Sequence, residues 1–102
     1  MKKNPLEIFQ EEAPELQESY AKVIQNLIDS QILDSKTKQL IYIAMKIIVD
    51  DKEAIKYHIP MAKAAGASRD ELKEVILLSL TVIGLKGISG YLGFGLDIYD
   101  NV

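Results

Sequence analysis

The stretch Asp51–Val75, DKEAIKYHIPMAKAAGASRDELKEV, predicts a helix, a glycine-centred turn and the start of a second helix. In the first helix, apolar residues and His58 recur at intervals of three or four, which places them on one face: Ala54, His58, Met61, Ala62 and Ala65. Gly66 can end this helix with a positive φ because it has no Cβ. Ser68 and Glu71 have the spacing of a capping box, which satisfies the first amides of the next helix. The chain's one histidine therefore lies on an apolar helix face shortly before a sharp turn.

Length and composition predict one domain over residues 1–102. The chain has 102 residues, of which 48% are hydrophobic and 26% charged, as is ordinary for a soluble globular protein. A net charge of −3 offers no basic field for phosphates, so we expect no nucleic-acid partner. The sequence has no cysteine, which excludes disulfides, thiolate catalysis and sulfur-ligated metals. No apolar export segment is visible near the first residues, and we expect a cytoplasmic protein.

Capping residues, prolines and apolar spacing predict three further helices and the extent of the helix that begins at Arg69. They span Pro5 to about Gln10, an amphipathic segment from near Pro14, about Lys36 to Asp50 with Asp34 or Ser35 as its cap, and Arg69 to about Gly84. The last two are apolar on nearly every side. Because 102 residues can hardly enclose two such helices, we expect an exposed apolar patch that other copies of the chain cover.

Five of the six glycines lie near the C-terminus, at positions 84, 87, 90, 93 and 95. This spacing favours close helix packing over a phosphate-binding loop, which would need a preceding strand and a Lys-Ser/Thr pair. The segment Val75–Leu96 is long enough to cross a bilayer, but Lys86 would then lie at mid-membrane. We therefore expect no membrane span.

Three segments together resemble the carboxymuconolactone decarboxylase-like family, which includes the alkylhydroperoxidase D-like proteins. They are LDSKTKQLI at 33–41, His58 on its helix, and AGASRDELKEVI at 65–76. The resemblance covers about residues 15–98. It implies an all-α, compact bundle of about five to six helices. It also implies assembly into homo-oligomers, commonly trimers or hexamers.

The sequence departs from the redox members of that family at three of four positions. Where those members have a Cys-x-x-Cys pair, this chain has Asp51 and Ala54, and their acidic residue aligns with Gln39. Only His58 remains. A thiol peroxidase needs a thiolate nucleophile and a resolving thiol, so we do not expect that activity here.

The candidate site consists of His58, Gln39 and Asp51. The ordinary pKa of histidine, near 6.5, suits proton transfer at neutral pH. Asp51 lies seven residues before His58, about 10 Å along the helix axis, so we expect no direct contact between them. Gln39 comes from the preceding helix and could bridge His58 or a bound water, and it could equally face solvent. A lone histidine is also often a buried side chain with a hydrogen-bond partner.

No metal or cofactor site is recognisable, because one histidine with scattered carboxylates forms no ligand set. None of three nearby cations forms an evident clamp for a substrate carboxylate: Lys52, Lys56 and Arg69. Pro60 inside the helix removes a backbone hydrogen bond beside His58 and predicts a kink. That kink is either tolerated strain or a reshaped pocket wall.

Three hypotheses for function follow. The first is lyase-type proton transfer by His58 on a small carboxylated or lactone substrate, which predicts a concave, partly polar pocket around the three candidate residues. The second is a non-catalytic homo-oligomeric binding or scaffold protein, which predicts that His58 is packed shut. The third, a redox partner that borrows cysteines from another protein, ranks last.

Overall fold

Helices are the only regular secondary structure in the computed structural model, which describes residues 3–102. Over this range there are six helices of eight residues or more and one single-turn helix, α6, and no strand. The predicted all-α bundle is therefore confirmed. The chain divides into two compact units, one that ends at Ile32 and one that runs Leu33–Val102. A single domain over residues 1–102 stays a prediction.

The first unit holds α1 (Pro5–Glu12) and α2 (Pro14–Asp29), and both helices begin at a proline as predicted. Proline suits this position because its missing N–H would have no partner within the helix. The Asn4 side chain caps α1 by accepting a hydrogen bond from the Glu7 amide at 2.9 Å. The rings of Phe9 and Tyr20 meet edge to face, with their centroids 5.9 Å apart, and join the two helices.

α2 is the amphipathic helix that the sequence predicts. None of its residues is buried. Its apolar side chains all belong to the exposed class: Leu16, Tyr20, Val23, Ile24, Leu27 and Ile28. Six large apolar side chains on one helix form an extensive exposed apolar face.

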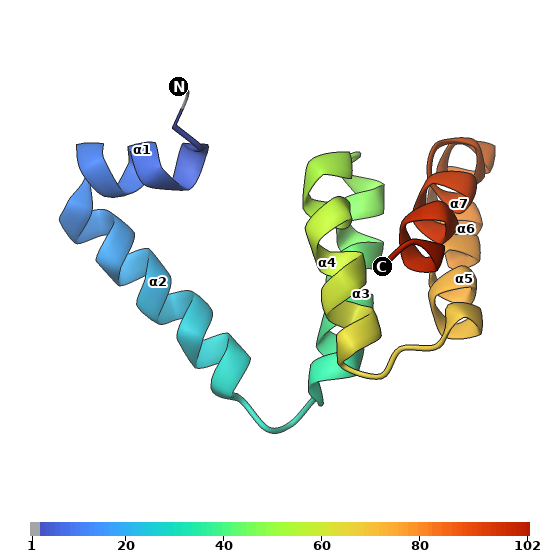
Figure 1. Ribbon diagram of the computed structural model, residues 1–102, viewed down its shortest axis with the longest axis horizontal. Coiled ribbons are helices and arrows are strands. Elements are labelled where there is room, and N and C mark those ends of the chain that lie inside the picture. Colours follow the sequence, from blue (N-terminus) through green and yellow to red (C-terminus); the bar gives the residue numbers. More distant parts are fainter. Residues whose placement is uncertain (1–2) are drawn as a thin grey trace. The chain divides into compact units, whose positions relative to one another are not determined.

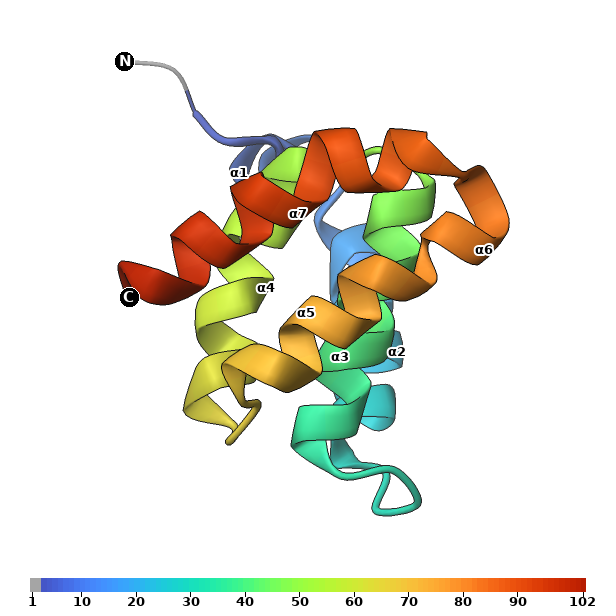
Figure 2. The same cartoon turned by 90° about the vertical axis from the view of Figure 1, so that its right-hand side faces the viewer.

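The second unit is built from two helical layers (Figure 1). One layer is the pair α3 (Ser35–Ile48) and α4 (Lys52–Ala64), and the other holds α5 (Arg69–Leu78), α6 (Leu80–Ile83) and α7 (Leu85–Asp100). Figure 2 shows α5 and α7 side by side in front of α3 and α4. The core lies between the layers and consists mainly of aliphatic side chains that are at most 1% exposed: Ile43, Ile47, Ile55, Ile59, Leu72 and Ile76.

The turn between α4 and α5 has the predicted structure. Gly66 has a φ of 102°, in the left-handed region. The Ser68 hydroxyl accepts from the Glu71 amide at 3.0 Å, and the Glu71 carboxylate accepts from the Ser68 amide at 2.8 Å. This is the complete capping box. Lys36 of α3 binds the same Glu71 carboxylate at 2.9 Å, so the cap also connects the two layers.

The turn between α3 and α4 begins earlier in the chain than predicted. α3 ends at Ile48 instead of Asp50, and its cap is Asp34, which accepts from the Thr37 amide at 2.7 Å. Asp50 has a φ of 57°, which non-glycine residues adopt only at a cost in free energy. Asp51 then begins α4 as its N-cap, with its carboxylate 3.1 Å from the Ala54 amide.

The predicted helix from Arg69 to about Gly84 is wrong in its extent, because the chain bends at Ser79 and forms two helices. The Ser79 hydroxyl donates to the Ile76 carbonyl at 2.6 Å, a local bond that competes with the helical pattern. Gly84, with a φ of 65°, ends the short α6. The segment Val75–Leu96 is thus divided among three helices. Nowhere in residues 3–102 does a helix combine the length and the apolar character that a membrane span requires.

The glycines of α7 are of two kinds. A Cβ at Gly87 would collide with the Ser79 side chain, and a Cβ at Gly95 would lie 2.7 Å from Cδ1 of Ile76. At Gly90 and Gly93 it would meet nothing within 4 Å. The predicted close packing is therefore confirmed at positions 87 and 95 only.

Candidate functional site

His58 lies on the half-buried face of α4 that meets α3. Its Nδ1 atom is 2.8 Å from Oε1 of Gln39, the candidate residue on α3. The two helices are consecutive and packed against each other, which brings together residues that are 19 positions apart. Of the alternatives for Gln39, a bridge to His58 is the one that the structure has.

This hydrogen bond determines which nitrogen of neutral His58 carries the proton. An amide oxygen can only accept, so Nδ1 must donate its N–H. Nε2 then keeps its lone pair. Within residues 3–102, Nε2 forms no hydrogen bond. The imidazole is therefore held from one side while its basic nitrogen stays available.

Tyr42 completes the immediate surroundings of His58. The two rings are stacked, with centroids 3.9 Å apart and an angle of 28° between their planes. Tyr42 follows Gln39 by three residues on α3, so both project toward α4. Tyr42 was not among the residues expected at this site from the sequence. The signal that could have found it is this interval of three from Gln39.

Asp51, the third candidate residue, interacts with other groups than His58, as expected. Its carboxylate binds Nζ of Lys46 at 3.0 Å and the Ala54 amide at 3.1 Å. The amide and, secondarily, Lys46 lower the pKa of the Asp51 carboxyl. Nζ of Lys46 also lies 5.5 Å from the centre of the Tyr42 ring. We call Gln39, Tyr42, Lys46, Asp51 and His58 the His58 strip.

The electrostatic surroundings favour neutral His58. Burial lowers the pKa of its imidazole, because desolvation disfavours the charged form. The positive charge of Lys46 lowers the same pKa further. Lys46, rather than Lys52, Lys56 or Arg69, is therefore the cation that acts on the imidazole. At neutral pH, His58 is therefore suited to accept a proton rather than to donate one.

The other charged residues considered from the sequence lie in separate interactions. Arg69 forms a two-pronged pair with Asp100, with its shorter distance 2.8 Å. Lys56 pairs with Glu53 at 3.8 Å, and both are exposed. Within the described chain, no three His, Asp or Glu side chains come together to hold a metal ion. α4 continues through Pro60 to Ala64.

The strip is a surface feature of one chain. Two cavities of the second unit are lined by other residues, and neither includes His58, Gln39 or Asp51. Exposed apolar side chains flank the strip on both helices, among them Met45 on α3 and Met61 on α4. Such a site can position and deprotonate a small molecule but does not by itself exclude water.

Comparison with known proteins identifies the family. The model of the carboxymuconolactone decarboxylase family matches residues 14–88, which include the whole His58 strip. No curated protein and no solved structure gave a match. The family match spans well over half of the chain and agrees with its all-α bundle. This chain therefore belongs to the carboxymuconolactone decarboxylase family.

Proposed function

We propose that this chain catalyses lyase-type proton transfer on a small carboxylated or lactone substrate, with Nε2 of His58 as the general base. The observation that carries the proposal is the hydrogen bond from His58 Nδ1 to Gln39, which leaves Nε2 unprotonated and unpartnered among residues 3–102. The lowered pKa of His58 supports the same role, since a base must be deprotonated at the working pH.

The other residues of the strip have distinct roles in this proposal. Gln39 is a positioning residue, because it acts through the imidazole. Tyr42 limits the tilt of the ring by stacking on it. Lys46 supplies a positive charge that favours a substrate carboxylate, and Asp51 holds the Lys46 side chain in place. Since the chain has no cysteine, thiol peroxidase chemistry is not part of the proposal.

The proposal includes assembly into a homo-oligomer, a trimer or hexamer, in the cytoplasm. Two sets of exposed apolar side chains support it, one along α2 and one beside the strip, because such faces are usually covered by a partner. A second copy that covered Met45 and Met61 would also shield His58 from water. Sedimentation at micromolar concentration tests the assembly. A monomer at that concentration would contradict it.

The experiment compares the wild type with His58→Gln and Gln39→Leu on a panel of lactones and β-keto acids. We expect His58→Gln to lose at least about a hundredfold in kcat, the range for general base catalysis. Gln39→Leu should lower kcat and shift the acidic limb of the pH–rate profile, while retaining part of the activity. Equal turnover by the wild type and His58→Gln would refute the assignment of the base. Tyr57→Phe, at an exposed position on α4, is the matched control.

One observation favours a second function, a non-catalytic binding or scaffold protein of the same fold. The His58 strip lines neither of the two cavities. This alternative requires that the assembled wild type be inactive on the whole panel. It also requires that His58→Gln and the wild type have the same oligomeric state and the same partners.

A further inference from the structure

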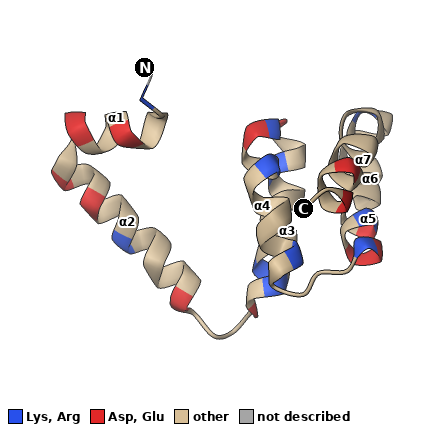
Figure 3. Ribbon diagram, viewed as in Figure 1, with Lys and Arg blue, Asp and Glu red and all other residues tan. Residues whose placement is uncertain are grey.

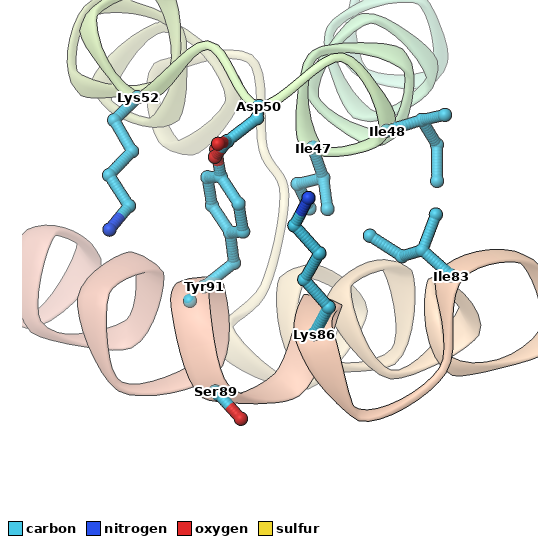
Figure 4. A pocket seen from close by; sticks show the side chains of 9 residues that line it. Ile47, Ile48, Asp50, Lys52, Ile83, Lys86, Ser89 and Tyr91 are labelled. Carbon is cyan, nitrogen blue, oxygen red and sulfur yellow. The ribbon is translucent and has the colours of Figure 1, made fainter.

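A cavity of about 500 Å³ lies between the α3–α4 turn and α7. This volume is within the range of sites that bind small organic molecules. Figure 4 shows its lining side chains, which come from both helical layers of the second unit. None of them belongs to the His58 strip. The cavity is therefore a feature separate from the proposed base.

Two lysines in this cavity have no acidic partner. Neither Lys52 nor Lys86 forms an ion pair or a side-chain hydrogen bond with any residue in 3–102. Nζ of Lys52 lies over the rings of Tyr91 and Phe94, 5.5 and 5.4 Å from their centres. Lys86 is the only charged residue between Glu74 and Asp97, and most of α6 and α7 is uncharged in Figure 3. Figure 4 shows its ammonium group directed toward the side of the cavity formed by Ile47 and Asp50.

The one carboxylate of the cavity, Asp50, is held by Tyr91. The hydroxyl of Tyr91, a side chain that is only 3% exposed, donates to the Asp50 carboxylate at 2.5 Å. This bond joins α7 to the residue whose φ of 57° is unfavourable without such support. Asp50 is thereby fixed at the cavity wall. With two ammonium groups and one carboxylate, the cavity has a net charge of +1.

Apart from Ser89, whose hydroxyl donates to the Leu85 carbonyl at 2.9 Å, the rest of the wall is apolar. Ile47 is buried, Ile48 is 39% exposed, and Ile83 is partly buried. In Figure 4, Ile48 and Ile83 lie on the same side of the cavity, next to Lys86. An apolar wall beside an unpaired ammonium suits a molecule with an acidic head and a short aliphatic chain.

We propose that this cavity binds a small aliphatic monocarboxylate, whose carboxylate binds the Lys86 ammonium and whose chain lies on Ile48 and Ile83, on the same side of Tyr91 as Lys86 in Figure 4. Ammonium–carboxylate hydrogen bonds are the strong kind, because both partners are charged. Asp50 selects for a ligand with a single negative charge. A second carboxylate on the ligand would be repelled by the negative charge of the Asp50 side chain. The site does not depend on His58 or on any reaction there.

The test is a titration with hexanoate, followed by amide chemical shifts in two-dimensional NMR. Hexanoate should shift the amides of the α3–α4 turn and of the first two turns of α7. 1-Hexanol, which has the chain but no charge, should bind about tenfold more weakly or worse. Lys86→Met should weaken hexanoate binding by a similar factor and leave hexanol binding nearly unchanged. Lys52→Met, across the Tyr91 ring from Lys86, should weaken hexanoate binding less.

Two controls keep this site apart from the proposed function. Lys56→Met removes an exposed lysine of α4 that does not line the cavity, and it should bind hexanoate like the wild type. His58→Gln should also bind like the wild type. Equal affinity for hexanoate and hexanol would overturn the proposal. So would equal losses in Lys86→Met and Lys56→Met, or shifts confined to the His58 strip.

Discussion

The hydrogen bond between Tyr91 and Asp50 gives the sharpest prediction about stability. Tyr91→Phe keeps the ring, which is packed in the core, and removes only the hydroxyl that donates at 2.5 Å. A hydrogen bond to a charged group contributes about 1.5–3 kcal/mol. Asp50 is exposed, so its carboxylate can regain water in the variant. We therefore expect the lower end, a loss of about 1.5 kcal/mol.

Urea unfolding at fixed protein concentration measures this loss. With a slope of about 1–2 kcal/mol per molar urea for a chain of this size, the midpoint should fall by roughly 1 M. Tyr57→Phe is the matched control, because Tyr57 is 69% exposed and has no bond of this kind. If both variants unfolded at the same urea concentration, the Tyr91 bond would contribute nothing and the reasoning would be refuted.

The same bond predicts a dependence of stability on alkaline pH. Burial and the nearby Asp50 carboxylate raise the pKa of the Tyr91 phenol above its ordinary value near 10. The folded state thus holds a proton that the unfolded state gives up. This contribution to stability is complete below pH 10 and decreases as the pH rises further. Tyr91→Phe should lack this decrease, and an identical alkaline profile in both proteins would contradict the assignment.

Three further predictions concern α7, the capping box and His58. Gly87→Ala should lower the free energy of unfolding by about 1–3 kcal/mol, because the new Cβ collides with Ser79. Gly93→Ala, where the new Cβ meets open space, should raise the free energy of unfolding by up to about 1 kcal/mol. Equal effects of the two variants in urea unfolding would show that the space at the two positions does not differ. Ser68→Ala should cost about 1 kcal/mol, and no change in the urea midpoint would mean that the cap is not formed. The pKa of His58 is lowered on folding, so its contribution is complete above the unfolded pKa near 6.5 and is lost as the pH falls below it. His58→Gln should be less sensitive to pH in that window, and parallel curves for the two proteins would count against the lowered pKa.

Local chemistry made much of the fold predictable. The capping box, the left-handed Gly66 and the prolines at the starts of α1 and α2 depend on residues within four positions of each other. The bond between Gln39 and His58 was also within reach, because consecutive helices pack as neighbours. These features need only helical spacing and caps.

The features that sequence reasoning missed depend on long-range packing. The chain bends at Ser79, where the Ser79 side chain packs closely against Gly87 of α7. The mostly apolar sequence of residues 75–83 does not indicate this bend. The bond between Asp50 and Tyr91 joins residues 41 positions apart, so neither partner identifies the other in the sequence. The cavity between α3 and α7 follows from that packing and could not be located before the layers were known.

Asp50 and Asp51 are neighbours in the chain, yet their carboxylates serve different surroundings. The first faces the cavity beside α7, and the second holds Lys46 next to the imidazole. Each carboxylate has its own partners, the Tyr91 hydroxyl for Asp50 and, for Asp51, Lys46 and the Ala54 amide. The two sides of this turn therefore stand on independent contacts. Filling the cavity beside α7 should leave the surroundings of the imidazole as they are, so one short turn can serve two sites without mixing them.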